Sequence, residues 1–477
     1  MTTSSTKPQA SSQIWESPAH KRTVYGVLAI VAITILFDGY DLVIYGAVLP
    51  NLLADPSQIG QLSPGVAGTL GSWAMIGVAI GALSAGAIGD RLGRRRVFLT
   101  AIAWFSIGMG LTALTTSVFA FGALRFFTGL GVGIIVATGG AIVAEFAPAG
   151  RRNFFNAIAY SGVPAGGVMA SLLALALEDA IGWRGLFLIG ATPILFLLPA
   201  AWFLLPESPK WLVATGQSMR AQELCTKFGL PESKFLTKPV SRDAIESETP
   251  AVSAENPTGK SGFAAIFSRV YLPGTLLIGT MSFVGLLSTY GLNTWLPVIM
   301  ENNGASSAHS MYTLLFLNGG AVVGGLLASK VADRVGAKAV ITVTFTLAAI
   351  SLMILPFTNN VFLTYIPIVI AGVGVLGTQV LTYGLTSNYF DTSARAAGVA
   401  WCAGFGRLGG IVGPVATGLM IGAGFGPTWA FGMFAGVAII GVICTMAIPK
   451  SPAVEKTITT EPAASADSRA RVTEGVS

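Results

Sequence analysis

Apolar runs of about 20 residues recur along the chain, and they restrict the folds that it can adopt, because a helix of that length crosses a bilayer. We identify twelve such runs: Val24–Leu49, Gly65–Gly89, Val97–Thr116, Phe119–Ile142, Phe154–Leu177, Gly185–Leu205, Tyr271–Ile299, Met311–Val331, Ala339–Phe357, Val361–Ser387, Ala396–Ile421 and Pro427–Ile448. Only 10% of the 477 residues are charged, whereas soluble domains carry about 25%. We therefore predict an all-α membrane protein with twelve transmembrane helices.

Lys and Arg residues lie almost entirely on one side of the predicted bilayer. Of the 28 such residues, we place only Arg184 in an outer loop, and only Arg125 and Arg407 within apolar runs. Because Lys and Arg collect in cytoplasmic loops, both termini are predicted to be cytoplasmic. The first residues contain no short apolar core with a cleavage site, so we expect no cleaved signal peptide.

The charge pattern divides the chain into five regions. We predict a cytoplasmic tail over residues 1–22, a six-helix bundle over 23–205, a cytoplasmic linker over 206–269, a second six-helix bundle over 270–449 and a cytoplasmic tail over 450–477. The linker has balanced charge, and Ser218–Phe228 within it is a candidate helix. Four prolines within the runs predict kinks or irregular turns. They are Pro164, Pro193, Pro367 and Pro414.

One loop sequence occurs twice, half a chain apart. Gly86-Ala-Ile-Gly-Asp90-Arg91-Leu-Gly93-Arg94-Arg95-Arg96 follows the second run, and Ser329-Lys-Val-Ala-Asp333-Arg334-Val-Gly336-Ala-Lys338 follows the eighth. Anchoring to anionic headgroups explains the arginines, but not the glycines or the aspartate. The glycines permit close helix contact, and Asp90 can accept hydrogen bonds near a helix N-terminus. Two related six-helix halves predict a substrate site at their interface, near the bilayer midplane.

Asp38 and Asp41 lie in the middle of the first apolar run, where a carboxylate costs about 2.5–3.5 kcal/mol on insertion scales. Their spacing places both on one helix face, and carboxylates so close disfavour double ionisation. Such a pair suits a proton carrier. A rise of about 1.5 Å per residue puts Arg125 near the depth of Asp41, and Arg407 near the midplane, somewhat deeper than Asp38.

These depths allow two arrangements. In the first, Asp41 pairs with Arg125 as a structural bridge and Asp38 carries the proton; in the second, both aspartates line the cavity and Arg125 tunes them. Salt bridges that only pack helices are a third interpretation. The second half offers no acid at mid-depth to pair with Arg407, so this guanidinium favours an anionic ligand, which it can bind through two hydrogen bonds.

The Asp90 segment matches the signature loop of the major facilitator superfamily, G-x-x-x-D-R-x-G-R-R, at every defined position. Within that superfamily the chain resembles the aromatic acid:proton symporters over roughly Tyr25 to Lys450. The matching segments are Asp38-Gly-Tyr-Asp41, Arg125-Phe-Phe-Thr-Gly-Leu-Gly-Val-Gly133, Ala144-Glu-Phe-Ala-Pro148 with Arg151-Arg152, Pro206-Glu-Ser-Pro-Lys-Trp211, Arg395-Ala-Ala-Gly398 and Gly404-Phe-Gly-Arg407-Leu-Gly409. The resemblance implies that the first-run aspartates, Arg395 and Arg407 act in transport.

Three groups of candidate residues follow. The proton-coupling candidates are Asp38 and Asp41. The substrate-binding candidates are Arg407, Arg125, Tyr290, Tyr383, Phe405, Asn293 and Gln379. The conformational candidates are Gly86, Asp90, Arg91, Gly93, Arg94, Arg95, Glu145, Asp333, Arg334 and Arg395. Packing is the alternative role for each aromatic residue, and hydrogen bonding to a neighbouring helix for each amide. We expect Glu145 to pair with Arg151 or Arg152, and Arg395 to serve as an anchor, a gate partner of Asp391 or a substrate contact.

The resemblance implies proton-coupled import of an aromatic carboxylate such as benzoate, a hydroxybenzoate or gentisate by alternating access across the plasma membrane. We expect a monomer that contacts membrane lipid, without a cofactor, a metal or nucleic acid. The alternatives are a symporter for another metabolite, a drug/proton antiporter and a nutrient receptor on a transporter scaffold. The sequence contains no Walker motif, which argues against a pump driven by ATP, and no nucleophile triad that would indicate an enzyme.

Overall fold

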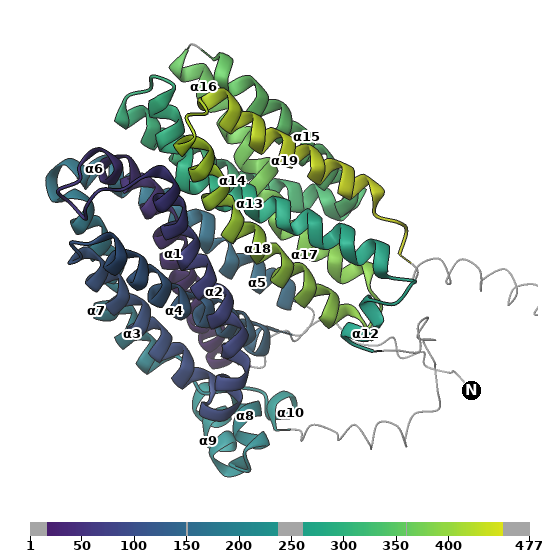
Figure 1. The fold of residues 1–477 in the computed structure, drawn as a ribbon. Coiled ribbons are helices and arrows are strands. Elements are labelled where there is room, and N and C mark those ends of the chain that lie inside the picture. Colours follow the sequence, from purple (N-terminus) through teal and green to yellow (C-terminus); the bar gives the residue numbers. More distant parts are fainter. Residues whose placement is uncertain (1–16, 149–150, 237–260, 359, 452–477) are drawn as a thin grey trace, which may run out of the picture.

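The computed structural model describes residues 17–148, 151–236, 261–358 and 360–451. Two helical bundles lie side by side, one from each half of the chain (Figure 1). Most of the two predicted tails and part of the linker, residues 237–260, lie outside the described ranges. Within those ranges the secondary structure is helical throughout and contains no strand.

Seven helices form the first bundle. They are α1 Pro18–Ala54, α2 Pro64–Leu92, α3 Arg94–Ala113, α4 Val118–Phe146, α5 Arg152–Tyr160, α6 Gly162–Ala191 and α7 Pro193–Leu204. Serines accept hydrogen bonds from the first-turn amides of α1, α2 and α4, as N-caps do. Three short helices follow, namely α8 Pro209–Ala214, α9 Ser218–Phe228 and α10 Glu232–Phe235. The linker helix predicted over Ser218–Phe228 is therefore confirmed.

The second bundle has the same plan. It consists of α12 Phe263–Ile266, α13 Leu272–Asn302, α14 Ser307–Val335, α15 Ala337–Ile354, η1 Leu355–Phe357, α16 Val361–Gly372, η2 Val373–Gly377, α17 Thr378–Tyr389, α18 Arg395–Gly422 and α19 Pro427–Ala447. The repeated loop adopts the same backbone in both bundles, because Gly93 ends α2 at φ 89° and ψ 145° and Gly336 ends α14 at φ 91° and ψ 140°. Only glycine adopts such angles readily.

Eleven stretches of the described chain are long and apolar enough to cross a membrane. One of them, Phe154–Leu204, has 51 residues, about twice what one crossing needs. The chain turns within it at Gly182, where φ is 63° and ψ is 178°. This stretch therefore provides two crossings, and the predicted twelve are present.

A helix break or an irregular turn lies at or near three of the four prolines. Pro164 follows the break between α5 and α6, Pro193 begins α7, and Pro367 lies in α16 ahead of η2, a π-helical turn. Pro414 lies inside α18, which continues for eight residues past it to Gly422. Its carbonyl oxygen accepts a hydrogen bond of 2.8 Å from Trp295 Nε1.

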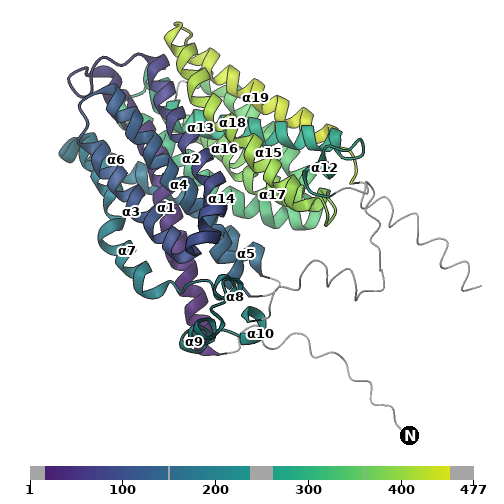
Figure 2. The same ribbon diagram turned by 60° about the horizontal axis from the view of Figure 1, so that its bottom comes forward.

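The short helices mark one end of the molecule. Figure 2 shows α8, α9 and α10 gathered near the first turns of α1, and Thr23 Oγ1 donates to the carbonyl of Phe228, at the end of α9, over 2.9 Å. The basic loops lie at this end as well, so we refer to it as the predicted inner end. The ribbons of the two bundles diverge toward it (Figure 1).

The bundles pack against each other mainly through α1 with α13, α2 with α18 and α6 with α14. Two glycines bring backbones together at this contact. A Cβ added at Gly46 would lie 1.9 Å from the carbonyl oxygen of Asn293, and one at Gly68 would lie 2.5 Å from that of Pro414. Both glycines lie toward the ends of their helices opposite the predicted inner end. We call this contact the outer seal.

Candidate transport site between the two halves

Asp41 and Arg125 form an ion pair inside the first bundle. Arg125 Nη1 of α4 donates to Asp41 Oδ1 of α1, and the residues are 2% and 5% exposed. The Arg125 guanidinium also lies 5.2 Å from the centre of the Tyr45 ring, a cation–π geometry. Of the two arrangements that the depths allowed, the structure contains the pairing of Asp41 with Arg125.

Asp38 lies one helical turn nearer the predicted inner end and has a different environment. Its side chain is half-buried and interacts electrostatically with Asp41 and, across the two halves, with Arg407. The two ion pairs found in the described ranges do not include Asp38 or Arg407. Asp38 and Arg407 are thus close enough to influence each other without being joined.

Three tyrosines lie within electrostatic reach of this pair. Tyr160 of α5, Tyr290 of α13 and Tyr383 of α17 all interact electrostatically with Arg407, and the first two also with Asp38. We call Asp38, Arg407 and these tyrosines the central cluster. It draws on both halves, which is where the internal repeat predicted a site.

Sequence reasoning missed Tyr160. We treated Phe154–Leu177 as one continuous run, whereas the helix breaks directly after this residue, between α5 and α6. The Tyr160 hydroxyl donates to the carbonyl of Val136 over 2.9 Å. The following Ser161-Gly162 and Pro164 were the signal for a break that would have drawn attention to it.

Phe405 and Tyr290 lie on the packed contact between α13 and α18. Phe405 stacks on Trp401, with ring centres 5.0 Å apart and planes at 23°, and its ring centre is 5.9 Å from that of Phe283. Tyr290 packs on Gly410, where an added Cβ would lie 2.8 Å from the ring. Aromatic surface is therefore present on both sides of Arg407 along α18.

The candidate amides of the second half differ in their partners. Asn293 donates to the Thr289 carbonyl over 2.8 Å and accepts from Asn318 Nδ2 over 2.9 Å. Both asparagines are buried, at 0% and 2% exposure, so they join α13 to α14. Gln379 is half-buried; its Nε2 donates to Ser282 Oγ over 3.2 Å and its side chain interacts with Tyr383.

The signature loop of the first half is held by a polar network at the predicted inner end. Arg94 Nη1 lies 2.9 Å from Glu145 Oε2, and Glu145 Oε1 accepts from Ser208 Oγ over 2.5 Å. The backbone N–H of Arg95 donates to Glu207 Oε1 over 2.9 Å. The partner expected for Glu145 was wrong: Arg151 and Arg152 are exposed, because the loop after α2 brings Arg94 to the end of α4 instead.

The remaining conformational candidates lie at the surface. Gly86, Asp90 and Arg91 are exposed, and the Asp90 carbonyl accepts from Trp211 Nε1 over 2.8 Å. Three residues of the second half are also exposed, namely Asp333, Arg334 and Arg395. Asp391 Oδ1 accepts a hydrogen bond of 2.9 Å from the backbone N–H of Ala394, the residue directly before α18.

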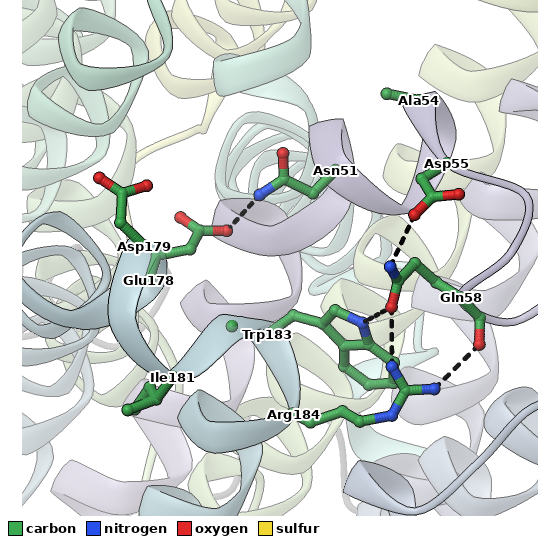
Figure 3. Close-up of a pocket in the computed structure, with 10 residues that line it drawn as sticks. Asn51, Ala54, Asp55, Gln58, Glu178, Asp179, Ile181, Trp183 and Arg184 are labelled. Carbon is green, nitrogen blue, oxygen red and sulfur yellow. Dashed lines mark hydrogen bonds between the residues drawn. The ribbon is translucent and has the colours of Figure 1, made fainter.

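A polar pocket of about 400 Å³ lies at the opposite end of the first bundle (Figure 3). Arg184, predicted for an outer loop, donates there to the Gln58 side chain over 2.7 Å, and to the carbonyls of Gln58 and Thr115 over 3.0 and 3.1 Å. Its guanidinium lies 4.3 Å from the centre of the Trp183 ring. Arg184 therefore ties outer loops together, apart from the central cluster.

Two six-helix halves with a charged cluster between them define a membrane transporter. The model of the Major Facilitator Superfamily matches residues 31–317 and 278–473. The benzoate transport protein of Acinetobacter baylyi is 30% identical over 91% of this chain and 90% of the relative. The gentisate transporter of Corynebacterium glutamicum is 30% identical over 86% of this chain and 84% of the relative.

Solved structures agree on the fold. The inward open conformation of the xylose transporter XylE from E. coli superposes with a TM-score of 0.69 at 17% identity, covering 90% of this chain and 96% of that one. The chain belongs to the major facilitator superfamily and, within it, to the aromatic acid:proton symporter family. It is therefore a transporter and not an enzyme.

Proposed function

We propose that this protein imports a small aromatic carboxylate together with a proton by alternating access. The observation that carries the proposal is the contrast between two acids one helical turn apart. Asp41 is joined to Arg125 within one half, whereas Asp38 faces Arg407 across the halves without an ion pair in the described ranges. Relatives that carry benzoate and gentisate support the substrate class.

In this proposal Arg407 binds the substrate carboxylate. A guanidinium stays charged at all relevant pH values and matches a carboxylate through two parallel hydrogen bonds. The aromatic surfaces of Tyr290 and Phe405 on α13 and α18 would contact the ring of the substrate. Asn293, buried against Asn318, would act by holding α13 in place.

Asp38 carries the proton in this proposal. When ionised it attracts Arg407, so it competes with the substrate carboxylate for the same guanidinium. Protonation removes that competition, and a proton and an anion bound together add no net charge to the central cluster. An unpaired charge at the bilayer centre is costly. The free energy of the occluded state should therefore be lowest when the carrier holds both the proton and the substrate.

The pair of Asp41 and Arg125 has a structural role in this scheme. It fixes α1 against α4 and so holds Asp38 toward the second half. The signature loop, with Gly93 and the pair of Arg94 and Glu145, would fasten the predicted inner end of the first half while the halves rock. Asp333, Arg334 and Arg395 would exchange partners as that end closes.

We further propose that the protein works as a monomer in the plasma membrane with both termini in the cytoplasm. The placement of Lys and Arg supports this orientation. The predicted boundaries, with bundles over 23–205 and 270–449 joined by a linker over 206–269, agree with this arrangement. No cofactor has a place in the mechanism.

The test is uptake of labelled benzoate and 4-hydroxybenzoate into cells that express the chain, with and without a protonophore. We expect uptake that the protonophore abolishes. Asp38→Asn should abolish accumulation, whereas exchange of labelled for unlabelled substrate should persist, since exchange needs no net proton movement. Arg407→Ala should abolish both.

Two outcomes would contradict the proposal. If neither acid enters although the protein reaches the membrane, the substrate class is wrong. If uptake survives both substitutions at the normal level, the transport site lies elsewhere. Tyr312→Phe, which alters a residue at the surface of α14 with 40% exposure, provides a control for expression and handling.

A further inference from the structure

Gln379 and Tyr383 present hydrogen-bonding groups beside Arg407. They are four residues apart on α17, so they lie one above the other on the same face of the helix. Both are half-buried, their side chains interact with each other, and Tyr383 interacts electrostatically with Arg407. The central cluster therefore has a polar wall in addition to its charges.

A π-helical turn sets the direction of this wall. The turn Val373–Gly377 ends directly before α17 begins at Thr378. One extra residue in a turn rotates everything that follows by about 100°, and single π-turns are frequent at functional sites. The turn is held by close packing, because a Cβ added at Gly374 would lie 2.3 Å from the Thr344 carbonyl oxygen.

The hydroxyl of Tyr383 differs from those of three tyrosines that join helices in the first half. Tyr40, Tyr45 and Tyr160 donate to backbone carbonyls over 2.7, 2.7 and 2.9 Å. Within the described residues, Tyr383 has no such backbone acceptor, and its side-chain partner is Gln379. This phenol is therefore not committed to holding helices together.

The amide of Gln379 differs in the same way from the other amides of the second half. Asn318 Nδ2 donates to both Asn293 Oδ1 and the Leu314 carbonyl, over 2.9 and 3.0 Å. Gln379 Nε2 donates a longer bond of 3.2 Å to Ser282 Oγ, and its other described partner is the Tyr383 side chain. An amide offers two donors and two acceptor sites, so Gln379 keeps hydrogen-bonding capacity for a ligand.

We propose that this carrier prefers aromatic acids that bear a ring hydroxyl over unsubstituted ones, and that Gln379 and Tyr383 bind that hydroxyl. The inference rests on the proposed function, with Arg407 holding the carboxylate. A ring hydroxyl replaces its bonds to water with bonds to the amide and the phenol. An unsubstituted ring would displace water from both groups and leave their remaining hydrogen-bonding sites unsatisfied, which sites of this kind discriminate against strongly.

The experiment measures uptake of labelled benzoate, 3-hydroxybenzoate and 4-hydroxybenzoate by the wild type and by Gln379→Met and Tyr383→Phe. Both substitutions keep the size of the side chain and remove its hydrogen-bonding group. We expect the wild type to take up one of the hydroxybenzoates at least about tenfold more efficiently than benzoate. Each variant should lose most of that preference, because uptake of the hydroxybenzoate should slow much more than uptake of benzoate.

Tyr312→Phe also removes a phenol hydroxyl, but at an exposed position of α14, and should keep the wild-type ratio. The inference is wrong if the wild type takes up benzoate as well as both hydroxybenzoates, or if the ratio stays unchanged in both variants. In these cases the proposed function still stands, because aromatic acids are carried. If none of the three acids enters the wild type, the proposed function fails and this inference fails with it.

Discussion

The two six-helix halves treat their charged side chains differently. In the first half, two buried acids are paired within the half: Asp41 with Arg125, and Glu145 with Arg94. In the second half, Arg407 faces Asp38 of the other half without an ion pair in the described ranges. Charges paired within one half stabilise its shape, whereas a charge left open toward the interface is available to a ligand that binds and leaves.

The repeated loop shows the same difference at identical backbone geometry. Gly93 and Gly336 share φ and ψ within a few degrees. An added Cβ at Gly93 would lie 2.6 Å from Glu207 Oε2, whereas one at Gly336 would meet nothing within 4 Å. In the first half, polar side chains such as Glu207 pack around this turn, whereas the same turn in the second half has no described neighbour within contact distance of a Cβ added at Gly336. Four predictions test the contrast between the halves.

The largest effect is expected at the paired acid. Asp41→Asn leaves Arg125 buried without its partner, which typically costs about 3–5 kcal/mol, so the unfolding temperature should drop strongly. Asp38→Asn removes no ion pair and should cost less than about 1 kcal/mol. Thermal unfolding of purified protein can be followed through the buried thiols Cys225, Cys402 and Cys444 with a thiol-reactive dye. Equal losses in both variants would contradict the contrast.

The next effect appears when both partners are removed. Asp41→Asn combined with Arg125→Gln should recover most of the lost stability, giving a coupling free energy of about 2–3 kcal/mol. The corresponding cycle of Asp38→Asn with Arg407→Gln should couple by less than about 0.5 kcal/mol. The same dye assay on all variants provides both cycles. A larger coupling for the second pair would mean that Asp38 and Arg407 are joined in the folded protein.

A smaller effect is expected at the repeated glycines. Gly93→Ala and Gly336→Ala should each cost about 1–3 kcal/mol, because both backbones occupy a region that only glycine adopts readily. Gly93→Ala should cost more, since its methyl group would also displace Glu207. Unfolding temperatures measured side by side separate the two terms. If Gly336→Ala is the more damaging change, the network around Gly93 does not stabilise the first half.

The smallest effect compares two acids at the predicted inner end. Glu145→Gln should cost about 1 kcal/mol, because the side chain of its partner Arg94 is 36% exposed and water screens the pair. Asp333→Asn should change stability by less than about 0.5 kcal/mol, as is usual for an exposed residue. Unfolding temperatures at low and high salt provide the measurement, and only the Glu145 variant should be less salt-sensitive than the wild type.

Sequence reasoning succeeded where the depth of a residue in the bilayer was enough to place it. Hydropathy located the crossings, and the constant rise of a helix placed Asp41 and Arg125 at one depth. Depth does not fix the rotation of a helix about its axis, which packing determines. For this reason the sequence left open whether Gln379 or Asn293 bonds to a neighbouring helix. Tyr160 and the partner of Glu145 were missed because a helix break and a loop path decide their positions.

The outer seal has a consequence for the energy supply of a cell. Main-chain atoms meet there directly, at Gly46 and Asn293 and at Gly68 and Pro414, so little room remains for a file of water along which protons could hop. A membrane could then hold many idle copies of this carrier without short-circuiting its proton gradient. A bulkier residue at Gly46 or Gly68 would push the two halves apart and let protons leak through the resting protein. Selection against such a residue would then act on this leak rather than on the rate of transport.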